Sequence, residues 1–408
     1  MDVIAQIRSA NAGRDPRRLK LKYRAMRDNP FAFLRGSCGL FYDRLPRGGI
    51  FRSAPAVWLC GDLHLENFGS YTGDNGLVYF DINDFDEGAL APASWDLVRL
   101  LTSVLVAADT LGSKNGARLC RIFVEAYAMA LAAGKAYWVE RDTAAGVVRV
   151  LLDALRDRKH AEFLDERTKP DGRKKRKLDV KGGKALPADE EERERVGAFM
   201  RTFAKSQPDP AAYKMIDVAR RIAGTGSLGL ERYVVLVRGA GSPDGNQLLD
   251  LKIALPSALG PHLKTAPQPR WPTQAERIAG VQQRLQAVPI ALLQPVRMDG
   301  RVFVLRALQP SQDRIDLKKA SAGDLESLVG TMGQLVAWAQ LRSAGRDGSA
   351  SADELIAFGQ QGQQWKTALL DAAKDMAALV RKDAATFAKA WDDGTLTVEK
   401  PARRSPTT

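Results

Sequence analysis

The segment 60–87, with the sequence CGDLHLENFGSYTGDNGLVYFDINDFDE, gathers seven carboxylates and one of the three histidines of the chain. Apolar runs at 56–60 and 77–80 precede its two polar groups, and the GDNG sequence at 73–76 is typical of a tight turn. We therefore expect strands whose polar ends lie side by side at one end of a small sheet. Carboxylates gathered in this way repel one another unless a hard cation lies among them, so the segment predicts a Mg²⁺ site that holds a phosphorylated ligand.

Composition limits the classes of protein to which the chain can belong. Its 408 residues suggest two lobes, and 45% hydrophobic with 27% charged residues is ordinary for a globular protein. We find no long uncharged apolar run and no apolar signal core, so we expect neither a membrane span nor export. Three widely spaced cysteines match neither a disulfide framework nor paired zinc ligands, which favours a reducing, cytoplasmic location.

The net charge of +13 is concentrated in the segment 167–184, where nine Lys or Arg stand against two Asp. We predict a basic surface hairpin around 181–184, which either is simply solvated or contacts an anionic substrate. Few aromatic residues are interleaved with these charges, and this disfavours a nucleic-acid partner.

The sequence of residues 213–310 predicts mostly strands. The sequence GTGSLG at 224–229 precedes a Val-rich strand rather than a helix, which favours a glycine hairpin over phosphates, with a plain glycine turn as the alternative. Lys252 lies in an apolar strand 26 residues after Gly226 and is a candidate to contact nucleotide phosphates. On the helix that begins after Thr273, Glu276 is predicted either to pair with Lys252 or to complete a capping box.

The candidate site residues have distinct predicted roles. Asp62 is the base or orienter for a substrate hydroxyl, and His64 organises its loop by hydrogen bonding. Asn67 and Asp81 are predicted to hold Mg²⁺, with Asp84 as a further ligand. The cover over the phosphates is assigned to Gly224, Gly226, Ser227 and Gly229. Supporting or structural roles are assigned to Glu66, Asp86, Glu87 and Asp96, the last by hydrogen bonds to backbone amides.

Several of these segments resemble known kinases. The segment 61–67 resembles the catalytic loop of aminoglycoside-phosphotransferase-like kinases, 80–87 their metal-binding segment, and 91–97 the Pro-x-x-x-Asp-Leu run that follows. The whole chain more closely resembles the DUF2252 family of bacterial proteins. The segments that carry this resemblance are 30–36, 60–69, 80–87, 224–229 and 304–309.

The resemblance implies an α+β, bilobal protein-kinase-like fold with ATP and Mg²⁺ as cofactors. Because the glycine loop and Lys252 follow the catalytic loop here, it also implies a circular permutation. We expect a large catalytic lobe at 1–205, a small antiparallel β lobe at 206–312, and C-terminal helices at 313–408 that pack on the large lobe.

The predicted function is an ATP–Mg²⁺-dependent phosphotransferase, with a nucleotide and an unidentified phosphate acceptor as its partners. A nucleotide-binding pseudokinase or a nucleotidyltransferase is the alternative, because Ile253 and the segment 340–342 depart from the expected family pattern. A metallophosphoesterase is a weaker alternative, suggested by Asp62-Leu63-His64, since only His160 and His262 remain as further histidines. The sequence leaves the acceptor and the oligomeric state open.

Overall fold

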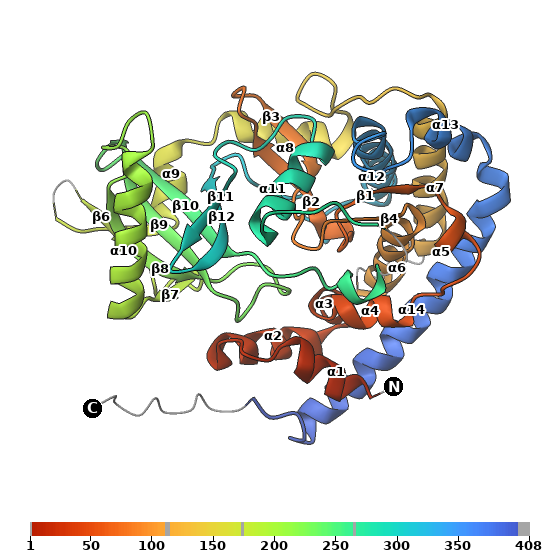
Figure 1. The fold of residues 1–408 in the computed structure, drawn as a ribbon, viewed down its shortest axis with the longest axis horizontal. Helices are drawn as coiled ribbons and strands as arrows, with labels where there is room; N and C mark the ends of the chain where they lie inside the picture. The colour runs from red at the N-terminus through yellow and green to blue at the C-terminus, as the bar shows by residue number, and fades with distance from the viewer. Residues whose placement is uncertain (1, 111–114, 173–174, 264–266, 399–408) are drawn as a thin grey trace.

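The strand-rich and helix-rich parts of the chain lie side by side (Figure 1). The computed structural model describes residues 2–110, 115–172, 175–263 and 267–398. We call residues 160–253 and 294–308 the sheet lobe, and the helices and short strands before and after them the helical lobe. The paired strands of the described residues are all antiparallel, and helices predominate, so the predicted α+β class is confirmed.

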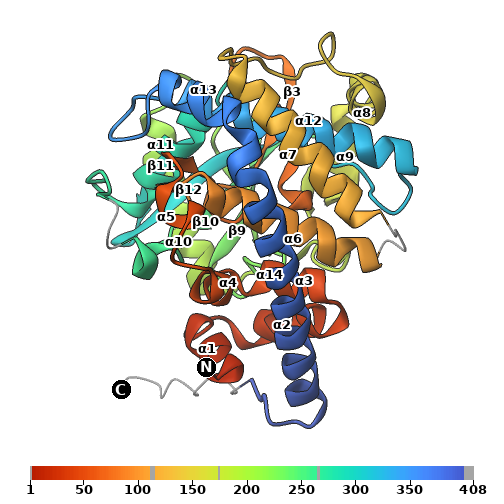
Figure 2. The same cartoon turned by 90° about the vertical axis from the view of Figure 1, so that its right-hand side faces the viewer.

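The helical lobe is built from both ends of the chain. Its first part comprises α1 (Val3–Ala10), α2 (Pro16–Asp28), α3 (Pro30–Gly36), α4 (Cys38–Arg44), α5 (Ile50–Ser53), β1 (Ala56–Leu59), η1 (Leu65–Asn67), β2 (Phe68–Thr72), β3 (Val78–Ile82), β4 (Ala89–Pro92), α6 (Ser94–Thr110), α7 (Gly116–Ala132) and α8 (Gly146–Arg156). Its second part comprises α12 (Ala322–Arg342), α13 (Ala352–Gln360) and α14 (Gly362–Asp392). The two parts share one apolar core, because α12 packs on α7 and α14 packs on α6, α2 and α3 (Figure 2).

Local sequence explains where several helices begin and which face they bury. Asp15 caps α2 by accepting a hydrogen bond from the Arg18 backbone N, and Pro16 occupies the first turn. Ser321 and Asp324 form a reciprocal capping box at the start of α12. The side chains of α12 that were predicted to face one way are buried: Leu325, Leu328, Val329, Met332 and Leu335. Their helical spacing predicted this packing correctly.

The sheet lobe is organised around a six-stranded sheet in the order β11-β12-β10-β9-β8-β7. Its elements are α9 (His160–Asp165), β5 (Thr168–Pro170), β6 (Arg176–Leu178), β7 (Ala185–Pro187), α10 (Glu190–Lys205), β8 (Met215–Arg221), β9 (Arg232–Gly241), β10 (Gly245–Ile253), β11 (Gln294–Met298) and β12 (Arg301–Leu308). The predicted Asp-Gly turn joins β11 to β12, with φ of +51° at Asp299 and +69° at Gly300.

The start of the sheet lobe and the position of the basic hairpin differ from the prediction. The sheet lobe begins before residue 206, because α10 buries Val196, Met200 and Phe203 against Val218 and Tyr233 of the sheet. The basic hairpin is centred elsewhere than at 181–184: β5 pairs with β6, whereas 181–184 leads from β6 into β7 at the sheet edge. Residues 173–174 of the basic segment lie outside the described residues.

Between the lobes lie the short helix η2 (Gly260–His262) and α11 (Gln274–Leu285). Helix α11 packs on β11 and β12 of the sheet lobe and on β1 and α12 of the helical lobe. It therefore joins the two lobes directly. Among the described residues, no helix combines the length and the apolar character needed to cross a membrane.

Candidate active site

The polar loop after β1 is held in place by α6. Asp96, in the first turn of α6, accepts hydrogen bonds from the backbone N atoms of Cys60 at 2.9 Å and Gly61 at 3.0 Å. Burial raises the pKa of Asp96 to about 6, although these two bonds oppose the rise. Gly61 has φ of +83°, and a Cβ there would lie 2.3 Å from the carbonyl O of Glu87, so only glycine fits. The structural role predicted for Asp96 is confirmed.

Asp62 has one carboxylate oxygen engaged by a buried arginine. Arg99 of α6 donates to Asp62 Oδ1 through Nε at 2.7 Å and also through Nη2. The Arg99 side chain is 0% exposed, whereas that of Asp62 is 23% exposed. Burial raises the pKa of Asp62 above its ordinary value, and Arg99 opposes this rise. No hydrogen bond within the described residues uses Oδ2, so this oxygen is available to a ligand hydroxyl.

His64 and Asn67 organise the same loop. His64 Nδ1 accepts a hydrogen bond from the Glu66 backbone N at 3.1 Å, which confirms the role predicted for this histidine. Burial, reinforced by neighbouring arginines, lowers the pKa of His64 well below its ordinary value, so the ring is neutral. Asn67 Nδ2 donates to the carbonyl O atoms of Asp62 at 3.2 Å and Asp84 at 3.4 Å. Asn67 therefore ties together the two acidic loops.

Asp81 is not part of the lining of the cavity described below, which Asp62, Asp84, Asp86 and Glu87 share. It lies within β3 opposite Gly69 of β2, and it is 2% exposed. Its carboxylate accepts hydrogen bonds from the backbone N atoms of Ile82 at 2.8 Å and Ala287 at 3.3 Å. Burial raises the pKa of Asp81 to about 6. Asp81 therefore holds backbone N–H groups, and its predicted role as a metal ligand stays a prediction.

Lys252 reaches from the sheet lobe to the second acidic loop. Its Nζ forms an ion pair with Asp86 and lies 4.0 Å from Asp84 Oδ1. Lys252 is buried at 8% exposure, whereas the Asp84 side chain is 54% exposed and lines the cavity described below. The loop carboxylates and the strand lysine, far apart in sequence, thus converge on one place.

Glu276 does not take either role predicted for it. Thr273 caps α11 by accepting bonds from the Ala275 and Glu276 backbone N atoms, but the Glu276 carboxylate does not complete a capping box. Its Oε2 is buried without a hydrogen-bond partner among the described residues, and Asp86 takes the predicted place beside Lys252. Helix α11 supports the site through Arg277 instead, which donates to the Asp86 carbonyl O at 2.7 Å.

The glycine-rich sequence connects β8 to β9, so the predicted strand–loop–strand arrangement is confirmed. Gly224 and Gly229 have φ of +65° and +87°. The first helices of the chain hold this loop from outside: Arg14 Nη1 donates to the Gly226 O at 2.6 Å, and the Asp15 backbone N donates to the Gly229 O at 2.9 Å. The N-terminal segment is therefore part of the site.

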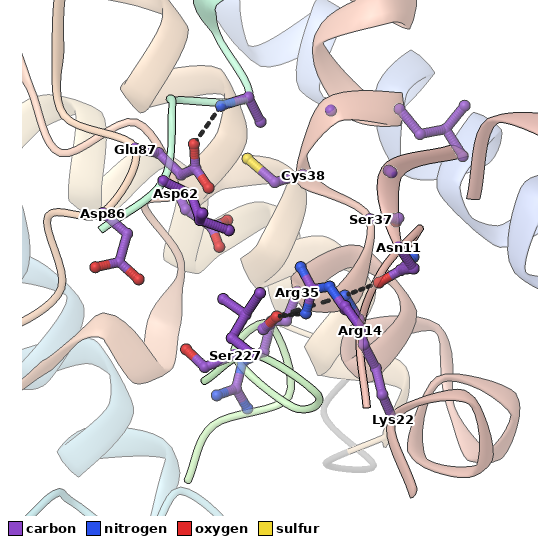
Figure 3. A pocket seen from close by; sticks show the side chains of 18 of the residues that line it. Asn11, Arg14, Lys22, Arg35, Ser37, Cys38, Asp62, Asp86, Glu87 and Ser227 are labelled. Carbon is purple, nitrogen blue, oxygen red and sulfur yellow. Dashed lines mark hydrogen bonds between the residues drawn. The ribbon is translucent and has the colours of Figure 1, made fainter. Parts of the chain in front are cut away.

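A cavity of about 290 Å³ lies between the glycine loop, the acidic loops and the N-terminal helices (Figure 3). Of the predicted site residues, its lining includes Asp62, Asp84, Gly226 and Ser227. Asp62, Asp86 and Glu87 lie on one side, and Arg14 and Lys22 lie on the other. Lys252 is adjacent through its ion pair with Asp86. The remaining predicted residues are not part of the lining: His64, Asn67, Asp81, Gly224, Gly229 and Glu276.

Three arginines surround one carboxylate behind Lys252. Asp250 lies two residues before Lys252 on β10, so the two side chains share a face of the sheet. Asp250 is 1% exposed. It forms ion pairs with Arg221 at 2.6 Å, Arg232 at 2.6 Å and Arg306 at 3.2 Å. Burial would raise the pKa of Asp250, but the three arginines hold it well below its ordinary value. The excess of positive charge favours a polyanionic ligand nearby.

Several residues of the site were not predicted from the sequence. Arg99 did carry a recognisable pattern, because it is the one charged residue in the apolar run LVRLL at 97–101 and buried arginines are rarely unpaired. Arg14 and Lys22 carried none, since they lie among many basic residues at the start of the chain. Asp86 was placed among the supporting carboxylates, because the sequence does not show which acid meets Lys252.

Comparison with known proteins gives one match. A family model described as "Uncharacterized protein conserved in bacteria (DUF2252)" matches residues 14–390. No curated protein and no solved structure was found to match the chain. The matched residues include both acidic loops, the glycine loop, Lys252 and Arg14.

Proposed function

The chain belongs to the DUF2252 family, and from the geometry of its site we propose that it is a phosphotransferase that uses ATP with Mg²⁺. The observation that carries this proposal is the convergence of Lys252 with Asp84 and Asp86, beside a cavity that Asp62 and the glycine loop also line. Phosphoryl transfer depends mainly on positioning and on neutralising phosphate charge, and these residue types supply both.

The residues present fit a Mg²⁺ ion that is shared with nucleotide phosphates. No three His, Cys, Asp or Glu side chains among the described residues form a self-contained metal site. Mg²⁺ does not need one, because it usually takes one or two carboxylates together with phosphates and water. Asp84 would hold the ion, with the Oδ1 atom of Asn67 as a second oxygen, since the Asn67 amide nitrogen already bonds to both loops. The ion would neutralise charge on the phosphates.

Asp62 is proposed to accept the proton of the acceptor hydroxyl. The hydroxyl oxygen forms a bond to the γ-phosphorus of ATP while the bond from that phosphorus to the bridging oxygen breaks, and ADP leaves. The proton passes to Asp62 Oδ2, because Arg99 occupies Oδ1. The raised pKa of Asp62 makes its carboxylate a better proton acceptor than an exposed aspartate. Lys252 and the basic groups behind it would contact the phosphates.

We further propose that the fold is protein-kinase-like and circularly permuted. Two features support this proposal. In the sheet lobe, β8, the glycine loop, β9 and β10 with Lys252 follow one another along the chain. The helical lobe is built from both ends of the chain. The loop with Asp62 therefore precedes the glycine loop in sequence while facing it in space.

Binding and transfer can be tested separately with the full chain. Calorimetry with MgATP and with ATP in the presence of a chelator should show binding that depends on Mg²⁺. Asp84→Asn should weaken MgATP binding at least about tenfold, because it removes a charged ligand of the ion. Asp74→Asn, a change of the same kind at an exposed turn position, should bind as the wild type does. Equal MgATP affinity in Asp84→Asn and wild type would refute the assignment.

The fate of the nucleotide separates the proposed activity from its alternatives. Release of ADP, with label from the γ-phosphate in the product, is expected for a phosphotransferase. Release of pyrophosphate with label from the α-phosphate would indicate a nucleotidyltransferase. Binding without turnover would indicate a pseudokinase. A metallophosphoesterase is not proposed, since His160 bonds to the Asn246 O and His262 to Asp43, so these histidines have contacts of their own.

A further inference from the structure

The N-terminal helices form one wall of the cavity, opposite Asp62. Gln6, Ile7 and Ala10 of α1, Asn11 and Arg14 of the α1–α2 connection, and Lys22 of α2 all line it. Figure 3 shows Arg14, Lys22 and Asn11 on the side of the cavity away from Asp62 and Glu87. The proposed phosphotransferase chemistry explains the acidic side but gives no role to this basic wall.

Lys22 is a buried lysine of this wall. It is 2% exposed, and its Nζ donates to Asn11 Oδ1 at 2.7 Å and lies 3.4 Å from the Gly226 O. Among the described residues, no carboxylate forms an ion pair with Lys22. Burial, followed by the charge of Arg14, lowers the pKa of Lys22 well below its ordinary value. Burial therefore disfavours the ammonium form of Lys22, and an anion bound beside Nζ would offset this cost and favour the charged form.

Arg14 provides a second cation in the same wall. Its Nη1 donates to the carbonyl O atoms of Gly226 at 2.6 Å and Leu228 at 2.9 Å, so its position is tied to the glycine loop. Burial lowers its pKa as well, and no carboxylate of the described chain forms an ion pair with it. Arg35 differs, because it is paired with Glu66. Arg14 and Lys22 are therefore the wall cations whose charge is left for a ligand.

We propose that the basic wall of this cavity, together with Asp62 opposite it, is the acceptor site of the phosphotransferase and that the acceptor is a small molecule with a hydroxyl group and an anionic group. The anionic group, a carboxylate or a phosphate, contacts Lys22 and Arg14, and the hydroxyl reaches Asp62. The cavity measures about 290 Å³ and is closed on one side by helices of the same chain, which suits a small molecule rather than a protein segment. The assignment of the acceptor rests on the proposed function, whereas the anion site does not.

The transfer step on this acceptor is balanced without a further reactant. The acceptor hydroxyl oxygen gains the γ-phosphoryl group, ADP leaves, and the hydroxyl proton passes to Asp62 and then to solvent. Lys22 and Arg14 take no part in bond breaking. They position the acceptor so that its hydroxyl, rather than water, lies beside Asp62, and they offset repulsion between the acceptor anion and the acidic side of the cavity.

Anion binding can be measured without nucleotide. We would titrate the full chain by calorimetry with inorganic phosphate, glycerol 3-phosphate, glycerate and glycerol. The anions should bind and glycerol should not, and the relative affinity of glycerol 3-phosphate and glycerate identifies the anionic group. Lys22→Met should weaken anion binding about ten- to a hundredfold, the loss expected for a charge-assisted hydrogen bond. Lys20→Met, at an exposed position of the same helix, is the matched control and should bind as the wild type does.

Two further measurements keep the proposal falsifiable. If Lys22→Met fails to fold, Arg14→Gln provides the test, because Arg14 is only half-buried. Saturation with MgADP should leave glycerol 3-phosphate binding intact, since the two ligands occupy different parts of the site. Competition between them would mean that the basic wall serves the nucleotide and would overturn the proposal, as would anion affinity that is unchanged in Lys22→Met. If the wild type binds the anions but does not bind MgATP, the proposed phosphotransferase activity is refuted and the proposed anion site is not.

Discussion

Asp62 and Asp81 are both largely buried aspartates in neighbouring loops and strands, yet their contacts give them different roles. Asp62 directs Oδ1 to Arg99 and lines the cavity. Asp81 uses its carboxylate to accept bonds from backbone N–H groups, and it is 2% exposed. Two substitutions of aspartate by asparagine therefore test different properties.

Asp62→Asn should abolish most of the phosphoryl transfer while MgATP binding is retained. The amide cannot accept the hydroxyl proton, and general-base catalysis typically contributes about 10²- to 10⁴-fold to the rate. The measurement is the rate of ADP formation at saturating MgATP, with calorimetry for binding. Asp74→Asn is the control, and a rate within a few-fold of wild type in Asp62→Asn would contradict the assigned role.

Asp81→Asn should change how stability depends on pH. The pKa of Asp81 is raised from 3.8 to about 6, so the folded state binds the extra proton between these values. The contribution of this group to the free energy of unfolding is fully present below about pH 4. It decreases by at most about 3 kcal/mol as the pH rises to about 6. The substituted amide does not titrate and keeps an acceptor oxygen for one of the two backbone N–H groups, so the lost bond lowers stability by an amount that does not depend on pH. Relative to wild type, the variant should become more stable as the pH rises from about 4 to 7.

Urea unfolding without Mg²⁺ at several pH values across this range measures the difference in unfolding free energy. Asp74→Asn should run parallel to the wild type, because its side chain is exposed. A difference between Asp81→Asn and wild type that stays constant with pH would show that the carboxylate is not buried as a proton-binding group.

Among the elements, the glycine loop and the N-terminal helices depend on each other. The loop offers the carbonyl O atoms of Gly226 and Gly229, and Arg14 and the Asp15 backbone N donate to them. Strand pairing between β8 and β9 positions the base of the loop, whereas these contacts from the α1–α2 connection hold the loop itself. The conformation of the loop therefore depends on a segment about two hundred residues away in sequence.

Gly229→Ala should loosen this contact more than Gly224→Ala. Both glycines have positive φ, so alanine costs about 1–2 kcal/mol at either position. At Gly229 the added Cβ would also lie 2.9 Å from Arg14 Cβ, whereas nothing lies within 4 Å at Gly224. We expect faster amide hydrogen exchange at Asp15 and weaker MgATP binding in Gly229→Ala only. The same exchange rate at Asp15 in both variants would contradict the contact.

For the whole molecule, the order of the chain and its arrangement in space differ. The helical lobe draws on both ends of the chain, and Arg8 Nη2 donates to the Thr395 O, so the described ends of the chain lie close together. The connection at 157–159 between the lobes is exposed. These two facts allow a direct test of the proposed permutation, because chains can be rejoined where ends are close and joins are at the surface.

A chain rejoined through a short flexible linker from residue 398 to residue 2 and opened between residues 157 and 158 should fold and bind MgATP. Its sheet lobe would then precede the acidic loops, in the order expected of a kinase. All contacts within the lobes are kept, so we expect cooperative thermal unfolding within a few degrees of wild type. Opening the same rejoined chain at residue 102, inside buried α6, is the control and should prevent folding. Failure of the first design with a folded control would contradict the proposal.

The sequence by itself determined the local features. The Asp-Gly turn between β11 and β12, the glycine loop between two strands and the buried face of α12 follow from φ preferences and from periodicity, which act between near neighbours. The hydrogen bonds of Asp96 to backbone amides were likewise predicted. The acidic groups after β1 and around the end of β3 were predicted to lie at one end of a single small sheet, and this was wrong, because β1 pairs with β4 and β3 pairs with β2 in separate sheets.

The tertiary structure decided which of these residues meet. Packing of the chain, and not composition, placed Asp81 of β3 against the backbone N–H of Ala287 and left Asp84, in the loop after β3, at the cavity. Lys252 meets Asp86 rather than Glu276 because Arg277 of α11 holds the acidic loop beside β10. The basic wall of Lys22 and Arg14 arises only when the N-terminal helices pack on the glycine loop. Such contacts join residues that no local pattern connects, so only the packed chain could bring them together.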